Sequence, residues 1–313
     1  MSAGSILRGF RASHGGIIMK NTNIVRRNRK IRTSIMFMLP ALVLYSVFVI
    51  FAILYSTVLG FTDWDGIGAK EFVGLENYIK LFGNEDFLLT LVNTLKVAVL
   101  SITFQVSIGL ILAWLLFRTR SRIYKLYRAV YFLPVVIAST AIATMFRIIL
   151  NNDIGVFSSL METVGLGGLV RPWLSDEKVV LYAVIIVQIW QYIGTYVIIF
   201  LAALQSIDES ILDSAGLDCR NSFQLFWHVV LPVIRPTLVT TIVLCFTGSM
   251  KSFDIPFIMT AGGPGYSSSY LGNYMYALIF SRRKFGRGSA VASIIMAVSL
   301  VFTVIFNKFT KEE

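Results

Sequence analysis

Charged residues are scarce in this chain of 313 residues, where Asp, Glu, Lys and Arg make up 14% and hydrophobic residues 56%. Soluble domains carry about 25% charged residues, so the composition excludes an ordinary soluble protein. Crossing a bilayer takes about 20 apolar residues, and only a helix satisfies its own backbone groups in lipid. The sequence therefore predicts an all-α polytopic membrane protein with six transmembrane helices. These spans lie at about residues 34–60, 88–117, 129–150, 179–204, 236–259 and 289–306.

Residues for metal binding and catalysis are few. The chain has 2 cysteines and 2 histidines. Cys219 falls in a loop and Cys245 in a span, so neither a disulfide framework nor a metal site is predicted. His228 has no partner pattern and no nucleophile motif beside it, so we predict no catalytic residue.

Phosphate-binding motifs are absent, because no G-x-x-x-x-G-K-[ST] sequence occurs. The chain therefore cannot hydrolyse ATP by itself, and we expect no cofactor in it. We also find no twofold repeat, and six spans are few for a carrier built from inverted repeats. A partner is expected to supply the energy or the second half.

Basic residues crowd the second connection without a single acid, whereas acids dominate the first connection. By the positive-inside rule both termini face the cytoplasm. Residues 1–33 then form a basic cytoplasmic segment, 34–306 the six-span domain and 307–313 a cytoplasmic tail. The net charge of +11 is assigned to topology and to anionic lipid rather than to nucleic acid. The basic residues of the second connection are Arg118, Arg120, Arg122, Lys125 and Arg128.

One basic cluster contradicts this orientation, because it precedes the last span on the outer side. Earlier connections weigh more in topology, so the orientation is kept and the role of the cluster stays open. The cluster consists of Arg282, Arg283, Lys284 and Arg287.

A polar stretch, residues 205–235, separates the fourth span from the fifth. Ser206 and Glu209 have the S-x-x-E spacing of a capping box, which predicts that a helix starts there. Asn221 and Gln224 indicate a second capped start. The first helix has a small apolar face with acids near its amino end, where the helix dipole favours them. That face consists of Ile211, Leu212 and Ala215.

The second helix carries an apolar stripe with helical spacing, which is suited to docking on the underside of the membrane domain. Prolines then break the chain into the fifth span, at Pro232 and Pro236. From periodicity alone, an ordinary connecting loop with interfacial aromatic residues explains the stretch equally well. The stripe consists of Phe223, Phe226, Trp227 and Val230.

The spacing of this stretch resembles the EAA motif of ABC-transporter permeases, which reads E-A-A, three residues, G, nine residues, I-x-L-P. Asp213, Ser214 and Ala215 take the EAA places and Cys219 the glycine place. A glycine there would permit a positive φ, which costs cysteine roughly 1 kcal/mol. Either Asn221 or Gly216 then absorbs the bend, or the loop is strained. The I-x-L-P places fall on Val229, Leu231 and Pro232.

The resemblance extends over nearly the whole chain from about residue 30 and is to the sugar-transporting branch, of the first permease subunit type. Segments that carry it are FTDWDG (61–66), FVGLENYIKLF (72–82), FLP (132–134), PWLSD (172–176), LQSID (204–208) and TAGGPGY (260–266). It implies a plasma-membrane subunit that pairs with a second permease, an ATPase dimer that binds ATP and Mg, and an extracytoplasmic sugar-binding protein.

Within this resemblance the first helix of the polar stretch corresponds to a coupling helix, which docks in a groove of the ATPase. Its acids would meet basic residues there. The residues implied in ATPase coupling are Glu209, Ile211, Leu212, Asp213, Ser214, Ala215, Cys219 and Pro232.

A substrate path is predicted where polar residues share one face in mid-membrane, because polar groups in lipid are costly and turn inward. The amides and hydroxyls match sugar hydroxyls, and Trp190, Tyr192 and Tyr196 offer ring faces. Polar residues also hold helices together, so this alternative stays open. The predicted substrate residues are Gln188, Gln191, Tyr192 and Thr195 on the fourth span, and Cys245, Ser249, Ser252 and Asp254 on or after the fifth.

Two other functional classes remain open. Lys251 and Asp254 are either an ion pair at the end of the fifth span, a substrate-selecting pair, or the working groups of a proton-coupled secondary carrier. An intramembrane enzyme would need a second catalytic group facing Asp254, and none is evident. The transported sugar also stays open: a disaccharide, an oligosaccharide, a uronate and glycerol phosphate all suit this branch.

Overall fold

The computed structural model describes residues 35–119, 124–152 and 155–311. The predicted basic segment 1–33 lies outside them, as do Arg120 and Arg122 of the second connection. The chain forms two compact units, residues 1–56 and 57–313. The described part of the first unit belongs to an apolar helix, Ile35–Leu59, which contains a π-helical turn, η1 (Ser46–Ile50), and continues as α2 (Phe51–Leu59).

The described residues contain five helices long and apolar enough to cross a membrane, and a bent helix pair gives a sixth span. These match the six predicted spans. After the first helix, the second span consists of α4 (Glu85–Ser101), η2 (Ile102–Val106) and α5 (Ser107–Arg118), and the third consists of α6 (Tyr124–Val136) and α7 (Ser139–Ile149). The fourth span is α9 (Val180–Gln205). The fifth span consists of α13 (Arg235–Met250) and α14 (Asp254–Thr260), and the sixth is α16 (Phe285–Lys311). Because α16 runs to Lys311, residues 307–311 of the predicted tail are helical.

Short elements connect the spans. Between the first two lie β1 (Thr62–Asp63), β2 (Glu71–Phe72) and α3 (Glu76–Phe82), and between the third and fourth lie α8 (Val156–Thr163) and η3 (Gly167–Leu169). Between the fourth and fifth lie α10 (Glu209–Asp218), α11 (Ser222–Leu225), η4 (Phe226–Val230) and α12 (Leu231–Val233). Before the last span lie α15 (Leu271–Tyr276) and η5 (Ala277–Ser281). The two strands pair antiparallel, with Thr62 opposite Phe72 and Asp63 opposite Glu71.

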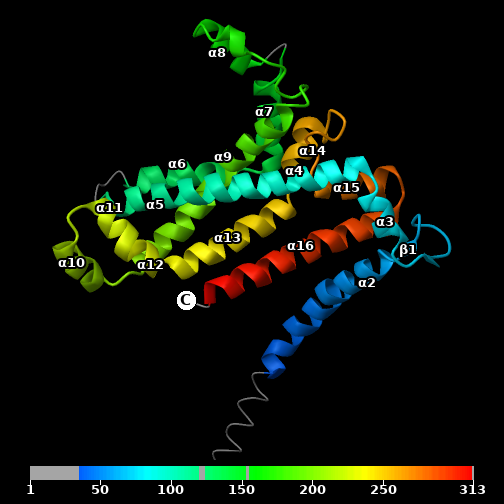
Figure 1. Ribbon diagram of the computed structural model, residues 1–313, viewed down its shortest axis with the longest axis horizontal. Helices are drawn as coiled ribbons and strands as arrows, with labels where there is room; N and C mark the ends of the chain where they lie inside the picture. Colours follow the sequence, from blue (N-terminus) through cyan, green and yellow to red (C-terminus); the bar gives the residue numbers. More distant parts are fainter. Residues whose placement is uncertain (1–34, 120–123, 153–154, 312–313) are drawn as a thin grey trace, which may run out of the picture. The chain divides into compact units, whose positions relative to one another are not determined.

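Helix α9 is central in the second unit, where it packs against α5, α6, α7, α13 and α14, while α13 also packs against α4 and α16 (Figure 1). Glycines permit the closest approaches. A Cβ on Gly194 would lie 2.1 Å from the carbonyl oxygen of Tyr131, and one on Gly109 would lie 2.7 Å from the Tyr196 Cβ. On the other side, the rings of Phe246 and Phe302 stack with centroids 3.7 Å apart. These contacts attach the fourth span to the second and third spans, and the fifth span to the sixth.

The third span is broken rather than straight, because α6 and α7 meet at 97°. Pro134 lies inside α6, and a proline removes a helical hydrogen bond. Gln191 of α9 satisfies the break, since its Nε2 donates to the Ser139 Oγ at 3.2 Å and to the carbonyl oxygen of Ile137 at 3.4 Å. A buried amide therefore stabilises the bend.

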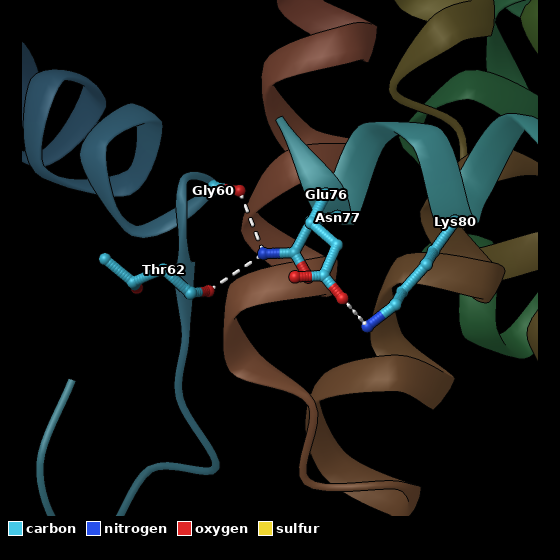
Figure 2. Close-up of polar contacts among 5 residues, drawn as sticks. All are labelled: Gly60, Thr62, Glu76, Asn77 and Lys80. Atoms are coloured by element: carbon cyan, nitrogen blue, oxygen red, sulfur yellow. Dashed lines mark hydrogen bonds and ion pairs between the residues drawn. The ribbon is translucent and has the colours of Figure 1, made fainter. Parts of the chain in front are cut away.

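A hydrogen-bonded corner joins the end of α2 to α3 (Figure 2). The Asn77 side chain is buried and donates to the carbonyl oxygens of Gly60 at 3.0 Å and Thr62 at 2.8 Å. Glu76 forms an ion pair with Lys80, and this ammonium group holds the pKa of the Glu76 carboxyl below its usual range. This corner lies at the end of the second unit opposite α10 (Figure 1).

The polar stretch is helical as predicted, but its boundaries differ in detail. Ser206 ends α9, and its hydroxyl donates to the carbonyl oxygen of Ala203, so the predicted Ser206 capping box is wrong. Asp208 caps α10 instead, because its carboxylate accepts the Ser210 N–H at 3.0 Å. The second predicted cap is confirmed: the Asn221 side chain accepts the Gln224 N–H at 2.8 Å.

Two further expectations for this stretch are wrong. Cys219 is extended, with φ −89° and ψ 122°, and neither Gly216 nor Asn221 has a positive φ. The turn after α10 therefore needs no glycine, and no strain arises at Cys219. Helix also continues through Pro232 and ends at Val233, since proline is tolerated in the first turn of α12.

Candidate functional site

A polar cavity of about 280 Å³ lies among the second, fourth and fifth spans. Six of the eight predicted substrate residues line it, although they come from different elements. These six are Gln188, Tyr192, Cys245, Ser249, Ser252 and Asp254. The structure thus brings together two polar faces that the sequence predicted separately.

Hydrogen bonds across the cavity join three spans. Ser252 Oγ donates to Gln188 Oε1 at 3.1 Å, and Gln105 Nε2 donates to the Gln188 carbonyl oxygen at 3.2 Å. The Cys245 thiol lies 3.5 Å from Gln105 Oε1. Amides and hydroxyls in such a network can exchange partners with a polar ligand, because each group both donates and accepts. The cavity is therefore suited to a ligand rich in hydroxyl groups.

Gln105 was missed by the sequence analysis, although it is an amide inside the predicted second span and is only 2% exposed. It lies in the π-helical turn η2, and such turns often occur at functional sites. Gly248, Phe253 and Ile255 also line the cavity without having been predicted. Tyr196, predicted as a ring face, lines it as well.

Two predicted substrate residues do not line the cavity. Gln191 points to the break between α6 and α7, where it bonds Ser139. Thr195 is half-buried and is not among the lining residues. The alternative that polar residues hold helices together therefore fits Gln191. Tyr192 does both, because it lines the cavity and its hydroxyl lies 3.2 Å from the Ser139 Oγ.

Lys251 and Asp254 are exposed residues that line the cavity. No ion pair joins them in the described part of the chain, so the ion-pair hypothesis is wrong. Lys251 lies at the carboxyl end of α13 and Asp254 in the first turn of α14. Each charge is favoured there by the dipole of its own helix. Both remain accessible to a polar ligand.

At the far end of the second unit, α10 projects from the bundle (Figure 1). Leu212 packs against the core that contains Leu204 and Val230, and Ala215 is half-buried. Of the other predicted coupling residues, Cys219 is half-buried and the rest are exposed: Glu209, Ile211, Asp213, Ser214 and Pro232. Leu212 lines the same hollow beside α5 as Glu209 and Asp213, so the two carboxylates lie on the attached side of α10, and both are exposed to another molecule.

Electrostatics and aromatic packing define the rest of this loop. The Ser210 N–H, which the Asp208 carboxylate accepts, holds the pKa of Asp208 below its usual range. Phe226 packs on Trp114, with ring centroids 5.3 Å apart, so the apolar stripe docks on the second span as predicted. Phe223 and Trp227 of the same stripe stay exposed at 71% and 50%.

Residues 105–311 match the family described as "Binding-protein-dependent transport system inner membrane component". The chain belongs to this family. The match includes α9, α13 and the whole loop between them, which is the region with the EAA-like spacing. The chain is therefore an integral membrane component of a transport system. The carrier alternative finds no support in this family assignment.

Individual relatives agree with the family assignment. The chain is 34% identical to the probable ABC transporter permease protein YurN of Bacillus subtilis over 88% of this chain and 95% of the relative. It is 31% identical to the lactose transport system permease protein LacF of Rhizobium radiobacter, over 86% and 90% of the two chains. A crystal structure of a bacterial ABC transporter involved in alginate import shares the fold, with a TM-score of 0.80 and 20% identity over 93% and 99%.

Proposed function

We propose that this chain is a permease subunit of an ATP-driven sugar importer and forms half of its translocation path. The polar cavity carries the proposal, because it places six predicted amide, hydroxyl, thiol and carboxylate side chains from two spans around one space. Relatives named for lactose transport and alginate import support a carbohydrate substrate.

In this proposal the cavity binds sugar through exchange of its internal hydrogen bonds. Gln188 and Ser252 bond each other in the structure, and each can turn to a sugar hydroxyl instead. The rings of Tyr192 and Tyr196, which also line the cavity, provide faces for sugar C–H groups. Asp254 accepts hydroxyl hydrogen bonds, and Lys251 donates them.

Coupling runs through α10. ATP and Mg are bound by a partner ATPase dimer, whose closure on ATP moves α10 inward. Only three residues separate α9 from α10, and α12 leads into α13 through Ile234 alone. Motion of α10 is therefore transmitted to both spans that line the cavity. The acidic face formed by Glu209 and Asp213 meets basic residues of the ATPase.

Both termini face the cytoplasm in this proposal, so α10 is cytoplasmic and the opposite end, with α3 and α15, faces outward. The outer end receives an extracytoplasmic sugar-binding protein, in line with the family description. A second, different permease completes the path in the plasma membrane, because the described chain contributes one side of a cavity open to its surroundings.

The proposal is tested by measuring the rate of ATP hydrolysis in proteoliposomes that contain the chain together with its second permease and its ATPase. We expect a sugar-loaded binding protein to stimulate hydrolysis, and an uncoupler to leave sugar uptake unchanged. Ser252→Ala should weaken the response to sugar, whereas Ser293→Ala on α16, whose hydroxyl bonds Ser289, should not. Uptake that collapses with the uncoupler and needs no ATPase would refute the proposal in favour of a carrier.

A further inference from the structure

A second hollow, of about 360 Å³, lies between the end of α13, α15 and α16. Its lining is apolar apart from Lys251, and includes Met250, Met275 and Ile295. We call it the side groove. Lys251 and Phe253 line both the side groove and the polar cavity. An occupant of the groove would therefore touch two residues of the proposed sugar site.

Aromatic rings extend the wall of the side groove along η5. Tyr276 lies 5.3 Å from Phe253 between ring centroids, and Phe280 lies 4.7 Å from Tyr276. Phe280 is 66% exposed. Aromatic side chains are enriched where a spanning domain meets the membrane interface. The groove thus continues into an exposed aromatic surface.

Three basic residues follow Phe280 at once: Arg282, Arg283 and Lys284. All three are exposed, and none has a carboxylate within 4.0 Å among the described residues. Arg282 is anchored, because its guanidinium donates to the Tyr266 hydroxyl at 2.6 Å. Lys284 and Arg283 keep their side chains unbonded to described residues.

The basic residues before α16 have an unfavourable backbone conformation and an unfavourable position for positive charge. Arg283 has φ 52°, a left-handed conformation that is rare for residues other than glycine. It is fixed by the Lys284 N–H, which donates to the Leu278 carbonyl oxygen at 2.8 Å. The cations also precede the amino end of α16, where the helix dipole disfavours positive charge. No described carboxylate forms an ion pair with these cations, so they are available to an external anion.

Helical spacing aligns the cations with the side groove. The Gly288 N–H donates to the Lys284 carbonyl oxygen, so Lys284 already follows the α16 spiral. Ile295, which lines the groove, is eleven residues further on. Eleven residues of helix span about 16 Å, which is roughly three turns and returns to nearly the same face.

We propose that this surface binds an anionic phospholipid, with the phosphate between Arg283 and Lys284 and one acyl chain running over Phe280 into the side groove. Arg and Lys side chains form charge-assisted hydrogen bonds with phosphate oxygens. A protein helix fits less well, because two turns of a helix about 10 Å wide occupy roughly 800 Å³, more than twice the groove volume. Lipid in the groove would then affect transport through Lys251 and Phe253.

The headgroup is tested on the full chain purified within its complex, with phosphatidylglycerol and phosphatidylcholine of identical acyl chains. Native mass spectrometry should show phosphatidylglycerol retained at least fivefold better. The double variant Arg283→Gln/Lys284→Gln should lose this preference. Arg171→Gln/Lys178→Gln removes the same charge from another exposed outer connection and should keep it. Equal retention of both lipids, or an unchanged preference in the first variant, would overturn the proposal.

The place of the acyl chain is tested by a variant that fills the side groove with a larger side chain. Ala292→Phe should lower retention of both lipids severalfold, whereas Ala297→Phe, at an exposed position of the same helix, should not. If Ala292→Phe leaves retention unchanged, the acyl chain lies elsewhere and the proposal is wrong. Binding of inorganic phosphate at this surface with no lipid retained, or capture of a polypeptide by a photo-crosslinker at position 292, would equally refute a lipid occupant.

Discussion

Gln188 and Gln191 are the same residue type three positions apart on α9, yet they have different partners. Gln188 bonds Ser252 in the cavity, and Gln191 bonds Ser139 at the break in the third span. We predict that Gln188→Ala raises the half-saturating sugar concentration about fivefold, which is the loss of one hydrogen bond worth about 1 kcal/mol. Sugar-dependent ATP hydrolysis measures this, and the amount of folded protein should stay normal.

Gln191→Ala is the matched variant and should behave in the opposite way. It removes the amide that satisfies the break, so we expect a destabilisation of about 1–3 kcal/mol with little change in the half-saturating concentration of the folded fraction. Thermal unfolding measured by size-exclusion chromatography checks this. A higher half-saturating concentration for Gln191→Ala than for Gln188→Ala would contradict the assignment of the two residues.

Asp208 gives the loop a dependence on pH. Its pKa is lowered in the folded state, so its capping contribution is present above the usual pKa and is lost as pH falls through the lowered value. We predict that Asp208→Ala speeds amide hydrogen exchange in α10 at neutral pH, whereas Asp208→Asn, which keeps an acceptor, does not. The difference between Asp208→Ala and wild type should shrink in strong acid, because the protonated carboxyl is a weaker acceptor than the carboxylate. A difference that does not change with pH would show that the negative charge contributes nothing to the cap.

At the scale of elements, the contact between α6 and α9 depends on Gly194. A Cβ at this position would overlap the carbonyl oxygen of Tyr131. We predict that Gly194→Ala destabilises the protein by about 1–3 kcal/mol, because backbone on both sides must move. Gly216→Ala on α10 meets nothing within 4 Å and should be neutral or slightly stabilising. Equal unfolding temperatures for the two variants would contradict this packing.

Apolar length predicted the spans well, since the bounds of α9, and those of α13 and α14 taken together, fall within a few residues of the expected ones. The break in the third span was not predicted, because FLP at 132–134 lies in a continuous apolar run and the bend depends on Gln191 from another helix. The Ser206 cap failed for a local reason: Asp208 competes for the same free amides two residues later.

The cavity was predicted in part. Polar residues at helical spacing identified Gln188, Ser249 and Ser252, but spacing alone cannot say which neighbour each one faces. Gln191 belongs to the same stripe and faces α6 and α7 instead. Gln105 was missed because several polar residues lie in the second span and the sequence does not say which of them faces the cavity; the contact between η2 and α9 brings Gln105 to the site.

At the scale of the whole molecule, the polar cavity and the loop that contains α10 lie at different positions along one long helix, α9. Gln188 and Gln205 are 17 residues apart on α9, a distance of roughly 26 Å along a helix. A ligand at one level can affect a partner at the other only if the helix moves as a rigid body. The dense packing of α9 against α5 and α6 favours such motion, because interlocked helices shift together rather than bend.

The most direct test of this coupling is co-purification of the tagged chain with the ATPase. Wild type should retain the ATPase. Asp213→Lys, which reverses an exposed charge on α10, should lower the retained amount about tenfold while still inserting in the membrane. Glu162→Lys, which reverses an exposed charge on α8, should retain it fully. If wild type retains no ATPase, or if Asp213→Lys retains as much as Glu162→Lys, α10 is not the coupling element.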